Sequence, residues 1–169
     1  MDIREDDNLR HVTLQTFAGS AMFERTFQEG MALVEETARY LDGRGREESR
    51  ELPRKAAMLY AGESMRVTTR LMQAASWLLV QRAVQEGDMA ASDALSDRYR
   101  LGSKEICFGA SKEGTDMLPA MLQDLLLRSD HLYRRIARLD DVLFNDNAKN
   151  AGVHNHLDRL HQAFGQESA

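Results

Sequence analysis

The residues from Leu52 to Glu86 predict one long helix that carries apolar side chains on two opposite faces. At about 100° per residue, the larger face collects apolar residues at steps of three and four along the chain. Its members are Leu52, Ala56, Leu59, Tyr60, Val67, Leu71, Ala74 and Leu78. A second set falls nearly opposite: Met58, Ala61, Met65, Met72, Leu79 and Ala83. A helix with two apolar faces is usually packed on both sides, so we expect it to lie between its own bundle and either a third helix or a second subunit.

The composition supports a helical fold and argues against a β-rich one. Leu, Ala and Met total 50 residues, whereas the β-branched Val and Ile total 10, and there are two prolines. Straight-chain apolar residues favour helices, and β-branched residues favour strands. The 169 residues suffice for one domain of ordinary size.

Two further helices are predicted from the same kind of spacing. One runs from about Ser20, which can act as its N-cap, to Leu41, and the other runs from about Met117 to Phe144. The seam of the second follows a strict 4-3-4-3 spacing: Leu118, Leu122, Leu125, Ser129, Leu132, Ile136, Leu139 and Leu143. Such a seam is typical of an antiparallel helical bundle.

The segments between these helices are rich in glycine and charge. Residues 42–51 predict a solvated connection, with Gly43 in a left-handed conformation directly after the first helix. Residues 88–100 suit one or two helical turns, and residues 101–116 predict a loop whose triplet 106–108 tucks against the bundle. The stretch 145–152 predicts the end of the third helix, and a short amphipathic piece follows it, with Val153, Leu157, Leu160 and Phe164.

We therefore predict an all-α fold. It is a three-helix antiparallel bundle with a short extra helix after the second long helix and a loosely ordered C-terminal tail. Residues 1–19 are expected to form an N-terminal arm, residues 20–144 the bundle domain, and residues 145–169 a flexible tail with a short amphipathic helix.

The net charge, the first ten residues and the apolar stretches limit the partners and the cellular compartment that we expect. The net charge of −5 argues against a general nucleic-acid binder, because phosphate contact needs a basic surplus. The acidic first ten residues do not resemble a signal peptide, and the densest apolar stretch, Leu71 to Val84, is too short and too polar to span a membrane. Cys107 is the only cysteine, so no internal disulfide can form. We expect a cytoplasmic protein.

The residue pattern predicts no metal site, no cofactor site and no catalytic nucleophile. His154 and His161 are two helical turns apart, too far to share one metal ion, and we expect no metal. Cys107 lies in an apolar triplet without a basic neighbour in sequence, which is typical of a buried thiol. The glycine pair at residues 43–46 reads as a turn rather than a phosphate cradle, and we expect no cofactor.

Polar residues within the long helices have structural and functional interpretations. Glu63 and Arg70 interrupt the larger apolar face, and we expect them to be paired because buried charges normally are. His131 could serve phosphotransfer if exposed, but the Lys and Gly typical of such helices are absent. Arg134, Arg135 and Arg138 could contact an acidic partner, although ion pairs with nearby Asp140 and Asp141 on a solvated face are the simpler reading.

The methionine stripe of the second face is the strongest sign of binding in the residue pattern. Met58, Met65, Met72 and Leu79 recur every seven residues, and flexible thioethers suit surfaces that contact other proteins. Ordinary core packing is the alternative. We name these four residues, together with Arg134 and Arg135, as candidates for partner binding or for a dimer contact.

Three stretches resemble one bacterial family. They are EGMALVEETARYLDGRGREESREL (residues 29–52), YAGESMRVTTRLMQAASWLLVQRAVQEGDM (residues 60–89) and RSDHLYRRIARLDDVL (residues 128–143). In these stretches the chain is similar to the regulator of CtrA degradation family of alphaproteobacteria. The second stretch is long and unusual in composition, which makes the resemblance specific.

The resemblance implies a non-enzymatic adaptor for the protease ClpXP. Members of this family are three-helix bundles that can pair as dimers and have a poorly ordered C-terminal tail. They dock on the ClpX unfoldase after a small response regulator, CpdR, has primed it. They then deliver cargo, including cell-cycle transcription regulators, at the cell pole. The resemblance carries no catalytic residue to this chain.

Two other classes of function stay open at this stage. A signalling or phosphotransfer bundle would use an exposed His131, and a structural homodimer would use the methionine stripe. A DNA-binding bundle is disfavoured by the net charge and by the lack of a basic stripe.

Overall fold

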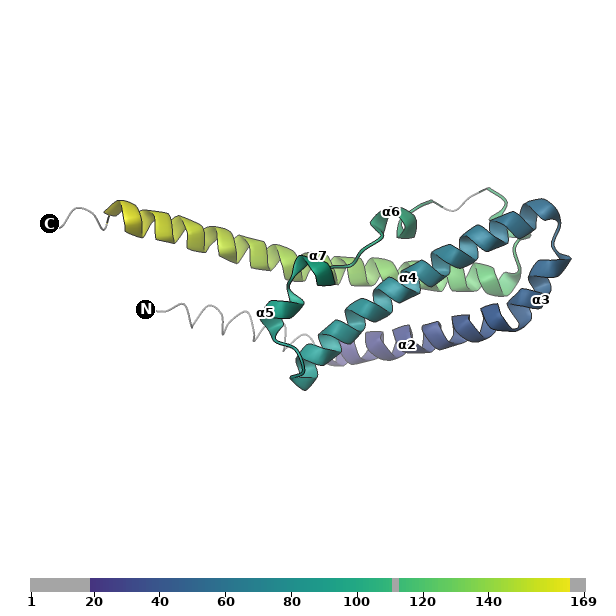
Figure 1. Ribbon diagram of the computed structural model, residues 1–169, viewed down its shortest axis with the longest axis horizontal. Helices are drawn as coiled ribbons and strands as arrows, with labels where there is room; N and C mark the ends of the chain where they lie inside the picture. The colour runs from purple at the N-terminus through teal and green to yellow at the C-terminus, as the bar shows by residue number, and fades with distance from the viewer. Residues whose placement is uncertain (1–18, 111–112, 165–169) are drawn as a thin grey trace.

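Three long helices form the frame of the protein in this computed structural model (Figure 1). The structure describes residues 19–110 and 113–164, with side chains as far as Phe144. The long helices are α2 (Ala21–Asp42), α4 (Arg54–Glu86) and α7 (Ala120–Phe164). The short elements that join them are α3 (Arg44–Glu51), α5 (Ala91–Ala94), η1 (Asp97–Tyr99), α6 (Lys104–Cys107) and η2 (Thr115–Met117). All regular elements in the described ranges are helical, which confirms the all-α prediction. The predicted arm, up to residue 18, and residues 165–169 lie outside these ranges.

The arrangement of the three helices is only partly antiparallel. On α2, Glu29 contacts Arg135 and Glu36 contacts Arg128, so α2 and α7 run in opposite directions. The partners of α4 on α7 instead advance in the same direction as α4. Arg70 reaches Leu126, and Trp77 reaches Asp140 further along. Helix α2 is thus antiparallel to both α4 and α7, since Glu24 near its start also pairs with Arg82 near the end of α4. Helices α4 and α7 are parallel, because the connection between them is long enough to return along the bundle (Figure 1).

The N-terminal end of α2 agrees with the sequence prediction, and its C-terminal end does not. The Ser20 hydroxyl accepts a hydrogen bond from the backbone N–H of Phe23 at 3.1 Å, as an N-cap does. Gly43 has φ −107° and ψ −112°, which is not the left-handed conformation expected there. The chain enters another helix at once instead of ending in a left-handed cap.

That next helix, α3, replaces the predicted solvated connection. Arg44 and Glu48 form an ion pair at i,i+4 (2.7 Å), and Glu48 also accepts a hydrogen bond from the Tyr40 hydroxyl (2.8 Å). Gly45 is buried, and a Cβ added there would lie 2.6 Å from the Tyr60 hydroxyl and 2.7 Å from the Tyr40 ring. The glycine thus allows a polar helix to approach two aromatic rings, a tertiary contact that local sequence does not reveal.

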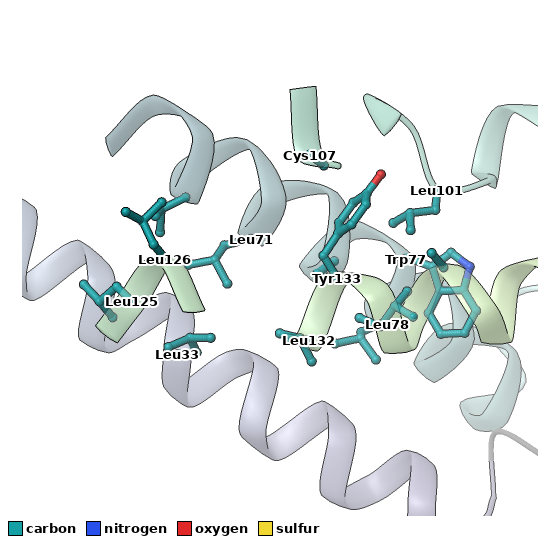
Figure 2. Close-up of a cluster of buried hydrophobic side chains, with 14 of the residues drawn as sticks. Leu33, Leu71, Trp77, Leu78, Leu101, Cys107, Leu125, Leu126, Leu132 and Tyr133 are labelled. Atoms are coloured by element: carbon teal, nitrogen blue, oxygen red, sulfur yellow. The ribbon is translucent and has the colours of Figure 1, made fainter. Parts of the chain in front are cut away.

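Helix α4 lies at the centre of the fold. Its larger apolar face is buried as predicted, and Gly87 ends the helix with φ +81°, the left-handed cap that glycine favours. Figure 2 shows the core between the three helices, where α4 supplies Leu71, Trp77 and Leu78, α2 supplies Leu33, and α7 supplies Leu125, Leu126, Leu132 and Tyr133. Gly30 of α2 allows the close crossing, because a Cβ there would lie 2.8 Å from the Leu78 side chain.

The connection from α4 to α7 contains more helix than expected. The short helix predicted within 88–100 is present as α5 and η1, and the segment predicted as a loop contains α6. In the triplet predicted to tuck against the bundle, Cys107 is fully buried and Phe108 is half-buried, whereas Ile106 is exposed.

Helix α7 continues beyond its predicted end. The expected break at residues 145–152 is wrong, since the helix runs without interruption to Phe164 and extends past the other helices (Figure 1). Asn, Asp and Gly lower helix propensity by up to about 1 kcal/mol each, but only proline prevents the helical hydrogen bond, and this stretch has none.

Candidate protein-interaction surface

The methionine stripe, Met58, Met65, Met72 and Leu79, lies on the surface of α4. These side chains are 71 %, 71 %, 67 % and 53 % exposed, respectively. The alternative of ordinary core packing is therefore wrong for them. The opposite face of the same helix contacts α2 and α7, so α4 is packed on one side and open to solvent on the other.

The exposed residues between the stripe members are small and uncharged. From Met58 to Leu79 the other exposed positions of α4 are Ala61, Thr68 and Ser76. The Thr68 hydroxyl donates to the Ser64 carbonyl at 2.9 Å, within the helix, so this polar group is already satisfied. In a protein with 29 % charged residues, about six turns of helix whose exposed positions include no Asp, Glu, Lys or Arg form a distinct apolar band.

The two arginine candidates lie elsewhere, on α7. Arg134 pairs with Asp130 at 2.7 Å, and its guanidinium lies 5.1 Å from the centre of the Phe108 ring. Arg135 contacts both carboxylate oxygens of Glu29 on α2 at 2.8 Å. Their partners are not members of the stripe, so the structure does not join the six candidates into one site.

Glu63 and Arg70 are both buried, as expected, but they do not pair with each other. Arg70 donates to the carbonyls of Cys107 (2.9 Å) and Leu126 (3.1 Å) and pairs with Asp130 at 3.0 Å. Burial lowers the pKa of Arg70, and the Asp130 carboxylate opposes this effect. Arg70 thus holds the 101–110 segment to α7.

Glu63 has no such set of partners. Its closest ionic neighbour is Arg66, at 3.4 Å, and neither carboxylate oxygen has a hydrogen-bond partner among the described residues. Arg66 in turn donates to the carbonyls of Gly109 and Ala110, both at 3.0 Å.

A buried aspartate that the sequence analysis did not predict, Asp140, binds the beginning of the 101–110 segment. Asp140 is fully buried and accepts hydrogen bonds from Trp77 Nε1 (2.9 Å), from the Leu101 N–H (3.4 Å) and from Arg100 (3.2 Å). The prediction of a solvated ion-pair face for Asp140 is wrong. The 4-3 spacing of Ile136, Asp140 and Leu143 was the available signal, because it continues the buried seam.

The structure also describes the surroundings of the candidate nucleophile Cys107 and of the candidate phosphate acceptor His131. Burial raises the pKa of the Cys107 thiol, which keeps it protonated and unreactive. His131 is exposed on α7, as the phosphotransfer alternative requires. Among the residues whose side chains the structure describes, 19–110 and 113–144, no group of three His, Cys, Asp or Glu could hold a metal ion. Within the same part of the chain, no helix is long and apolar enough to cross a membrane.

The fold and this surface define a class of protein: a helical bundle with an open, uncharged apolar face on one long helix, which is typical of a protein-interaction module. A family model described as "Protein of unknown function (DUF1465)" matches residues 14–164, and the chain belongs to this family. It is also similar to the crystal structure of RcdA from Caulobacter crescentus CB15. The sequence identity is 51 %, the TM-score is 0.63, and the match covers 77 % of this chain and 97 % of that one. The protein is therefore RcdA-like. No curated protein matches the chain.

Proposed function

We propose that this protein is a non-enzymatic adaptor that regulates proteolysis during the cell cycle. The observation that carries the proposal is its 51 % identity to RcdA over nearly the whole of that chain. The open apolar band on α4 supports it, because an adaptor needs a surface for other proteins and the band lies outside the core.

The proposed partners follow from the family resemblance. The adaptor docks on the ClpX unfoldase of ClpXP after a single-domain response regulator similar to CpdR has primed it. It then delivers a cell-cycle transcription regulator for degradation. We propose that the adaptor acts in the cytoplasm and is recruited to the cell pole. Arg134 and Arg135, which are partly exposed, are proposed as a second contact for a partner.

The methionine stripe is also suited to pairing with a second copy of the chain. Large residues at Met58, Met65, Met72 and Leu79 alternate with small residues three positions later, at Ala61, Thr68 and Ala75. In an antiparallel helix pair with its two-fold axis near residue 70, Met65, Met72 and Leu79 each face one of these small residues of the other copy.

In this antiparallel register each of these pairs of facing side chains therefore combines one large and one small residue, and the two helices stay equally far apart along the contact. Ala61 faces Leu79 of the partner subunit, Met65 faces Ala75 of the partner subunit, and Thr68 faces Met72 of the partner subunit, about a two-fold axis near residue 70. A parallel pair would set large residues against large and small against small. The equal spacing of the two helices favours antiparallel pairing of α4 in the proposed homodimer.

Spin labels distinguish the two arrangements. In the antiparallel pair, labels on Ala61→Cys are separated by at least about 27 Å along the helix axis, because each lies nine residues from the two-fold axis. In a parallel pair they would be about 10 Å apart. Cys107 is buried and serves as an internal control for selective labelling. A short distance would contradict the antiparallel register, and a monomeric mass at micromolar concentration would contradict the dimer.

Reconstituted degradation tests the adaptor function. ClpXP, a CpdR-like receiver domain and a CtrA-class regulator are combined, and the protein is added at increasing concentration. We expect cargo degradation to accelerate only when the receiver is present. Unchanged cargo half-life at saturating protein would contradict the proposal.

A signalling bundle is the second candidate function, and the exposure of His131 is the observation that favours it. Incubation with a phosphorylated receiver domain tests it directly. Phosphohistidine on the wild-type chain, absent from His131→Gln, would support this alternative, and its absence from both would exclude it.

A further inference from the structure

The return connection between α4 and α7 includes a segment that lies along both helices. We call residues 101–110 the strap. Gly102 lies beside Gln73, the Cys107 carbonyl beside Arg70, and the Gly109 carbonyl beside Arg66, so the strap runs opposite to the direction of α4. Figure 1 shows its helix α6 on one side of α7 and α2 on the other. The strap therefore lies across the seam where α4 and α7 pack, and we call the surface of the two helices that the strap covers the groove.

Side chains of α4 and α7 hold the strap mainly by its backbone. Gln73 Oε1 accepts from the Gly102 N–H (3.0 Å), and the Tyr133 hydroxyl donates to the Gly102 carbonyl (2.7 Å). Arg70 binds the carbonyl of Cys107, and Arg66 binds those of the last two strap residues. Backbone groups are the same in every residue, so these contacts recognise the path of the strap's backbone, which includes the turn of α6, with little dependence on its sequence.

Three apolar side chains of the strap contact the helices, and Lys104 adds an exposed ion pair with Asp141 of α7 at 3.3 Å. Leu101 and Cys107 are buried and Phe108 is half-buried against Tyr133, with ring centres 5.2 Å apart. Residues 103–106 are exposed, including Ile106 at 55 %. Ser103 has φ +59°, a left-handed conformation that costs energy for a residue other than glycine. The strap is thus a strained segment with few anchors.

The groove also has a binding group that the strap does not use. Glu63 is 1 % exposed, and neither of its oxygens accepts a hydrogen bond within the described part of the chain. It lies 3.4 Å from the same Arg66 that binds the end of the strap. A buried carboxylate is stabilised by a cationic or N–H donor, which a different peptide could supply there.

We infer that the groove between α4 and α7 is a peptide-binding site, occupied in the resting protein by its own strap. Its partner is a short peptide segment of another protein. That segment takes up the strap's conformation, with one helical turn at the positions of Lys104–Cys107. It has an apolar residue at the Leu101 position, a second one seven residues later at the Phe108 position, and a Lys or Arg near the end that reaches Glu63. Such a peptide replaces the strap's backbone contacts and adds the ionic contact that the strap lacks. This site is separate from the methionine stripe, and the inference holds whether or not the protein serves a protease.

Hydrogen exchange of the intact protein gives the first test. We expect the Gly102 amide to exchange at least 100-fold faster than amides in the middle of α4, such as that of Leu71, because the strap opens while the helices stay folded. Exchange of both amides at the rate of global unfolding would overturn the inference, since the strap would then be a fixed part of the core.

Peptide binding gives the second test. The probe is a fluorescein-labelled peptide with the sequence of residues 100–110, with serine in place of Cys107. A second peptide has lysine in place of Ala110. The full chain is compared with a Phe108→Ala chain, in which the strap is weakened and the groove is unchanged. We expect the variant to bind the first peptide at least tenfold more tightly than the wild type.

The lysine peptide tests the chemistry of the partner. We expect it to bind the Phe108→Ala chain at least fivefold more tightly than the first peptide. Adding Glu63→Gln should remove this gain, so that the two peptides bind equally. A Phe108→Ala chain that is folded by circular dichroism and binds neither peptide at millimolar concentration would overturn the inference. If that variant does not fold, hydrogen exchange of the wild type decides the question.

Discussion

Replacing Arg70 with methionine is expected to destabilise the fold by about 2–5 kcal/mol. Methionine keeps an apolar stem of similar length but removes the guanidinium, which is almost fully buried. The carbonyls of Cys107 and Leu126 then lose their donors, and an unsatisfied buried acceptor costs about 1–2 kcal/mol. Asp130 loses one ionic partner but keeps Arg134 and is partly exposed, so it adds about 1 kcal/mol at most.

Urea unfolding followed by circular dichroism measures this change, and a fall in the melting temperature of about 10 °C should accompany it. The matched control is Arg39→Met. Arg39 forms an exposed i,i+4 ion pair with Glu35, at 73 % and 74 % exposure, and its loss is expected to cost less than about 0.5 kcal/mol. If Arg70→Met lies within 1 kcal/mol of that control, the reasoning that Arg70 holds the strap and α7 together is refuted.

Three further predictions concern the dimer surface, α3 and the thiol. Met65→Asp combined with Met72→Asp should leave the helical circular dichroism unchanged, because both residues are exposed, and should halve the mass measured by light scattering; loss of helicity would show that the face is core. Gly45→Ala should lower the free energy of unfolding by about 1–2 kcal/mol, since the new Cβ overlaps the rigid Tyr40 ring, and unchanged stability would refute that contact. The raised pKa of Cys107 reduces its thiolate fraction, so at pH 8 it should react with a disulfide reagent at least about 100-fold more slowly in the folded protein than in urea; equal rates would contradict its burial.

Periodicity was a good guide to the long helices. The heptad spacing of the stripe and the 4-3 spacing of the core seam depend only on the geometry of one helix, so the faces of α4 followed directly from the residues. The Ser20 and Gly87 caps were predictable for the same reason, because capping is a local interaction.

Long-range contacts were not accessible in this way. The direction of α7 relative to α4 depends on where the 33-residue connection from 87 to 119 leads, and nothing in the apolar spacing distinguishes the two directions. Helix α3 exists because Gly45 meets two tyrosines from other elements. The Arg70 and Asp140 contacts bind backbone groups of the strap, which the sequence does not mark.

Exposure of the stripe also needed the structure. A methionine every seven residues is compatible with a core seam or with a surface contact, and the interpretation depends on whether another element covers it. The strap covers the neighbouring side of α4, through Arg66, Arg70 and Gln73, and leaves the stripe open.

Retention on the unfoldase is the most direct test of the adaptor function. Immobilised ClpX with a nucleotide analogue is incubated with the protein, with and without the CpdR-like receiver domain. The proposal predicts that the protein is retained only when the receiver is present and that it is recovered undegraded when the peptidase is added. Equal background binding with and without the receiver, by a protein with intact helicity, would contradict the adaptor function and favour a test of His131 phosphorylation.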